Sequence, residues 1–401
     1  MVCDLECFGV RLLLFAALVL ASLPARAADL TLVCLSVGQA VSACSDSASR
    51  FSQETGHNVR VVTADATGRY ALERYRALFD VQSTRIDVLQ FPDTWVPALG
   101  PDLATLPTPP DGEALPSVLK AGEDAGRLVG LPQHMAVTLL FLRGDVVAED
   151  LQAWSDLRQS LLGAPADGAN GLAFGGAGPT LFPLFLDWLF SFGATDLTDH
   201  DALLEALNLM NGAIGSITPA SMVSTSSQEA IADFTGGGAA ALVARSTALT
   251  SVRSSPLADN FEAVLRPQAS SAAPRAPLLV TTWYTGVSRH SRNSEAAAQL
   301  AQFLTSEAEQ RSAALQYGIA PTWPALYDDP DIQALGPVFR RIGQNLDHMV
   351  PPPILRYGTN YLDLSDEVAA AVRDMLTGKT TPETTAQVIG GAVRRASRQV
   401  D

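Results

Sequence analysis

The chain has 401 residues, of which 47% are hydrophobic and 17% charged, and its formal net charge is −15. This length exceeds what one ordinary hydrophobic core needs, so we expect two domains or lobes. The acidic charge and the lack of a lysine or arginine stripe argue against a nucleic-acid partner and against adhesion to anionic lipid.

The first residues are typical of an export signal. The segment "RLLLFAALVLASLPARA" has an apolar core from Leu12 to Leu23, followed by Pro24 and a small-residue pattern that ends at Ala27. It predicts a secretory signal peptide over residues 1–27. A retained membrane anchor is the alternative, but the apolar run is shorter than the roughly 20 residues that span a bilayer. We therefore expect no membrane insertion after cleavage.

Two of the four cysteines lie in this leader, and Cys34 and Cys44 remain in "LVCLSVGQAVSAC". In an oxidising compartment such a closely spaced pair predicts a disulfide, with two buried free thiols as the alternative. The remaining cysteines are too few for a thiolate metal site, and the five histidines are scattered. We expect neither a metal nor a cofactor.

The elements after the leader alternate between strand and helix. "DLTLVCLSVG" is an apolar run of strand length, and the helical segment after it ends at Gly56. "NVRVVTA" predicts a second strand, "GRYALERYRALFD" an amphipathic helix, and "IDVLQF" a third, buried strand. This alternation predicts a parallel sheet and the α/β class. The proline-rich "LPTPPDGEALP" predicts a surface connector.

The second half of the chain continues with mixed elements. "RLVGLPQHMAVTLLFLR" predicts two short strands broken at Gly130-Leu131-Pro132. The stretch from "AWSDLRQSL" to "LNLMNGAIGSI" is mostly helical, with the glycine loop "FGGAGPT" inside it, and "GGGAAALVAR" ends in a buried strand. "PLLVTTWYTGVS" predicts another strand, followed by one helix over "NSEAAAQLAQFLTSEAEQRSAAL", the irregular crossover "IAPTWPALYDDPDI" and two C-terminal helices.

The sequence contains none of the common catalytic or phosphate-binding motifs in a complete form. "GGAGPT" resembles a phosphate-binding loop only loosely, because no lysine follows it and no clear strand precedes it at the right distance. "TGKTT" has Arg373 where a P-loop needs glycine six residues before Lys379. Neither G-x-S-x-G nor H-E-x-x-H occurs, and no carboxylate pair is spaced for acid–base chemistry. We therefore do not expect an enzyme.

Six segments, taken in order, resemble the extracellular solute-binding proteins of ABC sugar importers, and the trehalose/maltose-binding type in particular. They are "SVGQ", "RFSQETGHNVRVV", "RIDVLQFPDTWVPAL", "RLVGLPQHMAVTLLFLR", "TTWYTGVSRHSRNSEAAAQLAQFLTSEAEQ" and "IAPTWPALYDDPDI". The resemblance extends over residues 29–396, and the collinear order is more specific than any single match.

The resemblance implies a two-lobed α/β periplasmic-binding-protein fold, type II-like, hinged around an interlobe cleft. It implies a first lobe of residues 28–136 plus 278–322 and a second lobe of residues 137–277 plus 323–401. Aromatic side chains in such a cleft stack on sugar faces, while carboxylates, arginines and amides bind hydroxyl groups. The implied role is that of a periplasmic monomer that binds a small molecule and delivers it to ABC permease subunits.

Several family positions are altered here. The aspartate of the "QxDVxW" pattern falls on Pro92, with Asp93 one place later, and the aspartate of "GLPxxxD" falls near Ala136 and Val137. Thr247 stands where the family often has tryptophan, and Pro352 where it has a late arginine. Each buried bonding partner lost costs about 1–3 kcal/mol, against about 8 kcal/mol for micromolar binding. We therefore expect a diverged site for a small carbohydrate-like or less hydroxylated solute.

The candidate ligand residues are those that the family pattern retains and the polar residues that replace lost ones. Gln39 lies at a strand–helix junction, where ligand-binding residues concentrate in α/β sheets, and the Trp283-Tyr284 pair lies where a strand emerges toward the cleft. Arg69 could instead be an ordinary helix-start cation, and Trp95 could be a packing residue. The full set is Gln39, Arg69, Asp93, Trp95, Gln133, His134, Trp283, Tyr284, Arg356 and Tyr357.

An alternative function is kept open by the altered cleft. The same fold could serve as a periplasmic accessory or sensor-partner protein that recognises another protein instead of delivering a nutrient.

Overall fold

The structure is a computed structural model that describes residues 27–36, 38–65, 69–109, 112–145, 151–163, 170–271 and 275–398. The predicted signal peptide, apart from Ala27, lies outside these described residues. None of the described helices combines the length and apolar character needed to cross a membrane.

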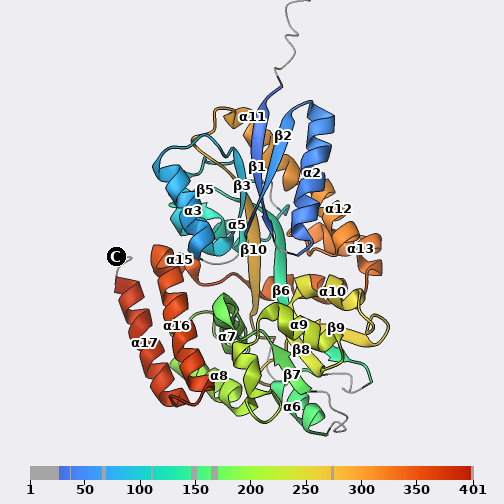
Figure 1. The fold of residues 1–401 in the computed structure, drawn as a ribbon, viewed down its shortest axis with the longest axis vertical. Coiled ribbons are helices and arrows are strands. Elements are labelled where there is room, and N and C mark those ends of the chain that lie inside the picture. Colours follow the sequence, from blue (N-terminus) through green and yellow to red (C-terminus); the bar gives the residue numbers. More distant parts are fainter. Residues whose placement is uncertain are drawn as a thin grey trace, which may run out of the picture.

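In the described part of the chain, the main sheet has nine strands, and seven of them follow the order β2-β1-β3-β10-β6-β8-β7 (Figure 1). The strand β11 pairs with β10, β9 pairs with β6, and β4 and β5 form a separate pair. The strands are β1 (Asp29–Ser36), β2 (Asn58–Asp65), β3 (Val88–Pro92), β4 (Glu123–Asp124), β5 (Arg127–Leu128), β6 (Leu131–Arg143), β7 (Asn170–Phe174), β8 (Ala239–Arg245), β9 (Phe261–Leu265), β10 (Leu278–Val287) and β11 (Met349–Val350).

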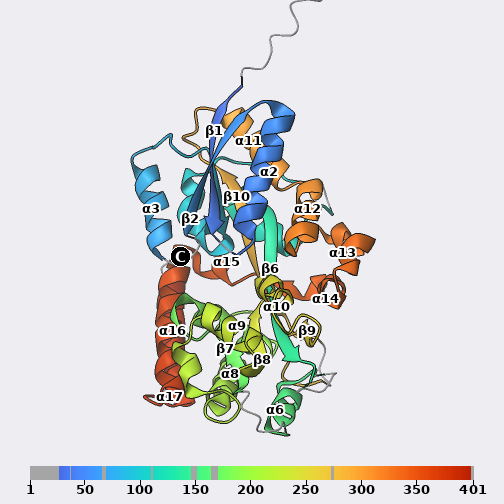
Figure 2. The ribbon, with the colours of Figure 1, turned by 45° about the vertical axis from the view of Figure 1, so that its right-hand side comes forward.

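The helices cover both faces of this sheet (Figures 1 and 2). They are α2 (Ala40–Thr55), α3 (Arg69–Asp80), α4 (Val96–Leu99), α5 (Pro116–Ala121), α6 (Trp154–Gly163), α7 (Leu181–Phe190), α8 (His200–Ala213), α9 (Ser227–Thr235), α10 (Leu249–Arg253), α11 (Ser294–Leu304), α12 (Glu307–Tyr317), α13 (Pro330–Ala334), α14 (Pro337–Gly343), α15 (Ile354–Tyr357), α16 (Tyr361–Leu376) and α17 (Pro382–Arg398). The expected α/β class is confirmed.

The first lobe is built on β1, β2 and β3, which pair in parallel. Side chains alternate between the two faces of a strand, so Leu32 and Cys34 of β1 join the cluster formed with α2 and α11, while Val33 joins the residues of α3. The strand β10 closes this half of the sheet by pairing antiparallel with β3. The sheet is therefore covered by helices on both sides, as its apolar strands require.

The second lobe is built on β7, β8 and β9 together with the second half of β6. Helix α7 lies in its centre, because its sequence "LFPLFLDWLF" is apolar apart from Asp187, and every residue except Pro183 is buried. Helices α16 and α17 pack against each other and against α7 and α8 on the outside (Figure 1).

Two strands run from one lobe into the other (Figure 1). In β6, Val137 still pairs with Val280 of β10, whereas the next residue, Thr138, pairs with Arg245 of β8. The change of partner occurs inside a continuous strand, so the two lobes share one sheet and are joined by hydrogen-bonded strands. The residue boundaries expected for the two lobes stay a prediction.

Three local expectations differ from the structure. The single helix expected after β10 is two helices, α11 and α12, because the side chain of Ser306 caps α12 by accepting from the amide of Glu309. The second short strand expected after Gly130 is the long strand β6.

The third difference is the segment before the glycine loop, where no clear strand was expected. The strand β7 runs directly into this loop. A Cβ at Gly176 would lie 2.5 Å from the carbonyl oxygen of Met222, so a side chain does not fit there.

Candidate ligand-binding site

A small pocket lies between the lobes, where the start of α2 and the end of α12 meet the segment after β8. Its volume is about 10 Å³, which is room for about one water molecule. Gln39 follows β1 and Ser246 follows β8, so the pocket collects residues from the carboxyl ends of strands in both lobes. We call it the interlobe pocket; its lining residues are Gln39, Ala40, His134, Ser246, Thr247, Thr250, Tyr317, Gly318, Ile319 and Ala320.

His134 and Ser246 are the buried polar residues that line this pocket. The side chain of His134 is 5% exposed, and its Nε2 atom has no hydrogen-bond partner among the described residues. Burial lowers the pKa of His134 to about 4, because removal from water disfavours the charged imidazolium. The ring is therefore neutral at ordinary pH, with one nitrogen that donates and one that accepts a hydrogen bond.

The backbone explains where His134 points. A β-bulge interrupts the pairing of β6 with β10, since Trp283 pairs with His134 while Tyr284 pairs with Pro132. Gln133 is the extra residue of this bulge, and such a bulge changes the direction of the neighbouring side chains. Because His134 lies directly across from Trp283, their rings stack with centroids 5.0 Å apart and planes 10° apart.

Trp283 and Tyr284 have different environments. Trp283 is half-buried beside His134. Tyr284 is fully buried, stacks on Phe91 and donates its hydroxyl hydrogen to the carbonyl of Val118 at 2.5 Å. Adjacent strand residues face opposite sides, so only Trp283 lies with His134. The structure places Tyr284 in the core of the first lobe.

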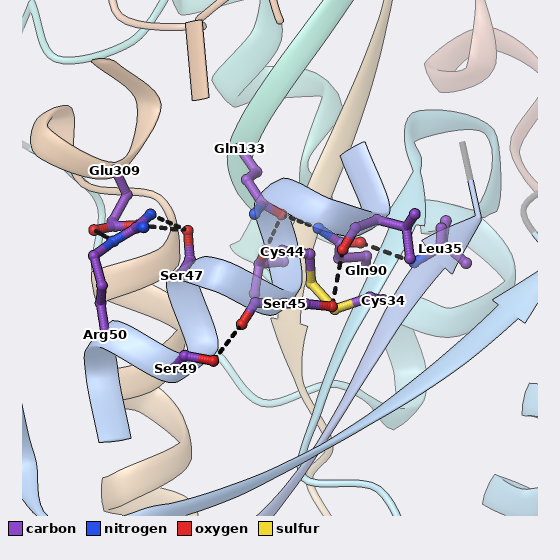
Figure 3. Close-up of a disulfide and its surroundings, with 12 residues drawn as sticks. Cys34, Leu35, Cys44, Ser45, Ser47, Ser49, Arg50, Gln90, Gln133 and Glu309 are labelled. Carbon is purple, nitrogen blue, oxygen red and sulfur yellow. Dashed lines mark hydrogen bonds and ion pairs between the residues drawn. A yellow bond between two sulfur atoms is a disulfide. The ribbon is translucent and has the colours of Figure 1, made fainter. Parts of the chain in front are cut away.

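Gln133 also points into the first lobe. Its Oε1 atom accepts hydrogen bonds from Nε2 of Gln90 at 2.6 Å and from Oγ1 of Thr285 at 2.8 Å. Gln90 in turn accepts from the amide of Leu35 at 2.9 Å. Figure 3 shows Gln133, Gln90 and Leu35 in this chain beside the disulfide. The amide oxygen of Gln133 is thus already bonded to other residues of the first lobe.

The expected disulfide between Cys34 and Cys44 is confirmed (Figure 3). It joins the end of β1 to the first turns of α2 with a Cα–Cα distance of 6.0 Å, and both cysteines are fully buried. Gln39 lies in the loop that this bond closes. Its carbonyl begins the helix by accepting from the amide of Ala43, while its exposed side chain makes no capping bond. Gln39 therefore lies in a loop that the disulfide closes covalently.

Ser246, Thr247 and Thr250 line the second-lobe side of the interlobe pocket. The hydroxyl of Ser246 accepts from the amide of Val137 at 3.4 Å, and the hydroxyl of Thr250 donates to the carbonyl of Tyr317 at 3.1 Å. Ser246 and Thr250 were not among the expected ligand residues. The hydroxyl-rich segment "RSTALTS" directly after a buried strand is the sequence signal that could have found them.

Asp93 and Trp95 lie at the end of β3 and are both buried. The carboxylate of Asp93 accepts from the amides of Thr282 at 2.9 Å and Thr94 at 2.8 Å. Burial raises its pKa to about 7, against the opposing effects of these bonds and of Arg245 in the second lobe. Trp95 packs on Tyr75 with ring centroids 5.9 Å apart. Neither residue lines the interlobe pocket.

The expected arginines form ion pairs. Arg69 at the start of α3 contacts Asp363 at 2.7 Å and Asp366 at 2.8 Å, both on α16 of the second lobe. Arg356 contacts Asp196 at 3.1 Å.

Tyr357, the neighbour of Arg356, is fully buried, and burial, followed by the charge of Asp196, raises its pKa to about 12. Arg69, Arg356 and Tyr357 do not line the interlobe pocket.

A second hollow of about 80 Å³ lies in the second lobe at the carboxyl ends of β7 and β8. Asp187 lines it, is buried, and accepts a short hydrogen bond from the hydroxyl of Thr138. Arg245 and Arg266 approach its carboxylate at 3.9 and 3.8 Å. Burial raises the pKa of Asp187, opposed by both arginines. This cluster was not expected from the sequence, because its charged residues come from distant segments.

Comparisons with known proteins identify the family of this chain. Residues 46–339 match the family described as bacterial extracellular solute-binding proteins. A protein of Deinococcus radiodurans named as a probable ABC transporter-binding protein is 25% identical over 397 residues, covering 92% of this chain and 94% of the relative.

Solved structures share the fold across their whole length. The maltose-bound MalE3 protein of T. maritima is 24% identical, with a TM-score of 0.82 over 92% of this chain and 100% of that one. The GacH receptor of Streptomyces glaucescens, solved unliganded and with acarbose, is 19% identical, with a TM-score of 0.79 over 93% and 99%. A solute-binding protein from Agrobacterium vitis with bound D-mannitol is 18% identical, with a TM-score of 0.74 over 93% and 98%.

The family match extends over most of the chain, and the solved structures share its two-lobed α/β fold. The chain belongs to the bacterial extracellular solute-binding proteins of ABC transporters.

Proposed function

We propose that this protein binds a small, neutral, hydroxyl-bearing solute in and around the interlobe pocket and presents it to the permease of an ABC importer. The proposed solute is sugar-like or polyol-like and carries fewer hydroxyl groups than a disaccharide. The maltose and D-mannitol bound by proteins of the same fold support this class of solute.

The unpartnered Nε2 atom of His134 carries the proposal. A buried polar atom without a partner is costly, and a solute hydroxyl satisfies it in either imidazole tautomer, because a hydroxyl both donates and accepts. A cationic solute is disfavoured, because the pocket offers a neutral imidazole and no carboxylate. Gln39 and Thr247 add exposed polar side chains on the two opposing lobes.

Binding requires the two lobes to separate. A pocket of about 10 Å³ holds one water molecule and no sugar, so entry of a solute needs a change in the strands β6 and β10 that join the lobes. Such hinge motion is common in two-lobed proteins that close around a ligand. Trp283, half-buried at the bulge, is then the aromatic surface on which a sugar or polyol face packs.

The remaining parts of the role follow from the family. Solute-binding proteins of this family work outside the cytoplasm with small molecules and ABC permeases. We propose the periplasm as the location, a monomer as the working form, and binding without chemical turnover. The family match does not favour an accessory or sensor-partner function.

Thermal unfolding with a panel of sugars, polyols and organic acids tests the solute class. A solute that binds only the folded chain at about 100 times its Kd adds about 2.7 kcal/mol to the free energy of unfolding. We expect a rise in Tm with a polyol or a small sugar and none with cationic solutes such as choline. A cationic solute that stabilises the protein more than any sugar or polyol would contradict the proposal.

A further inference from the structure

A groove lies on the outer surface of the first lobe, between the edge strand β2 and helix α3. Its volume is about 280 Å³, close to the smallest cavities that bind small molecules. β2 is the last strand in the sheet order, and in the described chain it pairs only with β1. Helix α3 leaves part of this face open, since Val62 of β2 is 37% exposed.

Three arginines from three separate segments line this groove. They are Arg60 on β2, Arg74 on α3 and Arg85 before β3, and we call the cavity the arginine groove. None of the three forms an ion pair with a described residue, while Arg60 donates to the hydroxyl of Thr31 at 3.1 Å. In a chain with a net charge of −15, a local cluster of cations without ion pairs to described residues favours the binding of anions here.

The walls between the arginines are apolar. Val33 of β1 and Ile86 form its buried floor, while Leu78 of α3 is half-buried, and Val62 and Tyr70 at its side are 37% and 73% exposed. Tyr75 also lines it, and its buried hydroxyl has no hydrogen-bond partner among the described residues. A ligand with an apolar body would remove this surface from water, and an acceptor on it would offer a partner to the tyrosine hydroxyl.

We propose that the arginine groove binds a small organic anion, a carboxylate attached to an aromatic or branched aliphatic body. The carboxylate takes hydrogen bonds from the guanidinium groups at the rim, in the geometry that planar arginine favours. The apolar body lies against Val62, Leu78 and the ring of Tyr70, which are the apolar lining residues with surface open to solvent. An inorganic anion would leave these apolar side chains exposed to solvent.

The groove is independent of the solute site, because it shares no lining residue with the interlobe pocket. All three arginines are exposed, so salt screens their attraction, and binding weakens as ionic strength rises.

The test uses 2-naphthoate as the probe and isothermal titration calorimetry as the measurement, with the neutral 2-naphthamide as the matched compound. We expect saturable binding of the acid and about tenfold weaker binding of the amide. Arg74→Gln combined with Arg85→Gln is expected to weaken binding of the acid about tenfold. The control Arg158→Gln, which removes an exposed charge on α6 of the second lobe, should leave it unchanged.

A second pair of variants keeps the test independent of folding. Val62→Glu places a carboxylate at the exposed edge of the groove and is expected to abolish binding of the acid, whereas Val62→Thr changes it less than about twofold. Equal affinity of wild type and the double arginine variant, or equal affinity for acid and amide, would overturn the proposal. So would binding only of long acidic peptides and not of 2-naphthoate. Sugar or polyol binding, measured in the same variants, should stay as in wild type.

Discussion

His134 and Trp283 come from neighbouring strands that cross between the lobes, and their rings lie parallel with centroids 5.0 Å apart. The next residue of β10, Tyr284, points the other way into the first lobe. One strand thus carries a side chain for the interlobe region and a side chain for the core in consecutive positions. We therefore expect solute binding to depend on Trp283 and folding stability to depend on Tyr284.

Substitutions at these positions should have different effects. His134→Ala is expected to weaken solute binding about tenfold or more, because a buried solute hydroxyl loses its partner. Trp283→Ala should weaken it by about tenfold through loss of aromatic packing. Titration of each variant with the best sugar or polyol from the thermal panel measures both effects.

Tyr284→Phe is the matched control for these two variants. It removes the hydrogen bond to Val118 and should cost about 1 kcal/mol of folding stability, with solute affinity unchanged. Loss of affinity in Tyr284→Phe equal to that in Trp283→Ala would contradict the assignment of Tyr284 to the core.

The stability of the protein should depend on pH through two buried groups, His134 and Asp93, which change the stability in opposite directions as the pH rises. The pKa of His134 is lowered to about 4. Below about pH 6.5 the imidazole is therefore protonated in the unfolded chain, whereas in the folded chain it stays neutral until the pH approaches about 4. Stability from neutral His134 is therefore lost as pH falls from about 6.5 to about 4. The pKa of Asp93 is raised to about 7, so its contribution is present below about 4 and is lost as pH rises toward 7.

Urea unfolding of two variants at pH 5 and pH 8 separates these groups. The difference in free energy of unfolding between His134→Gln and wild type should favour the variant by about 2 kcal/mol more at pH 5 than at pH 8. Asp93→Asn should be more destabilising at pH 5 than at pH 8 by a similar amount, because the wild-type carboxyl is neutral at the lower pH. A free energy difference that is the same at both pH values would rule out the assigned shift for that residue.

We expect Arg69 to affect the separation of the two lobes more than the affinity for the solute. Its ion pairs with Asp363 and Asp366 join α3 to α16, which lies below α3 in Figure 2. The three side chains are 44%, 73% and 67% exposed. Solvent screening then limits their contribution to about 0.5 kcal/mol. Arg69→Gln should widen the distribution of lobe separations in small-angle X-ray scattering and weaken solute binding about twofold at low salt.

Arg356→Gln is the control for this variant, because it also breaks an ion pair, with Asp196, but not one that bridges the lobes. It should not change the scattering. A loss of solute affinity for Arg69→Gln of about tenfold, equal at low and high salt, would instead mean that Arg69 contacts the solute directly.

The disulfide should stabilise the loop that carries Gln39. Replacing Cys34 and Cys44 together by alanine removes a crosslink over a short loop and should cost about 2–3 kcal/mol of folding stability. Urea unfolding with and without dithiothreitol checks this. The reductant should lower the stability of the wild type to near that of the variant and leave the variant unchanged. A wild type whose disulfide is fully reduced without any loss of stability would contradict this prediction.

Much of the fold could be predicted because its signals are local. Apolar runs of strand length, helices that end at glycine, and the alternation of the two appear within short windows of sequence. The disulfide between Cys34 and Cys44 could be predicted for the same reason, because both cysteines lie in one strand–helix unit. The split between α11 and α12 was missed, because Ser306 begins a new helix within a continuous helix-forming pattern.

The site was less predictable, because its members are defined by contacts between distant segments. Gln39, His134 and Trp283 were predicted and lie in or beside the interlobe pocket, whereas Tyr284 and Gln133 bond within the first lobe. The sequence by itself determined the strands, the helices and the polar residues at strand ends. Only the tertiary structure decided which way those residues face, because the bulge between β6 and β10 depends on a pairing between strands more than a hundred residues apart.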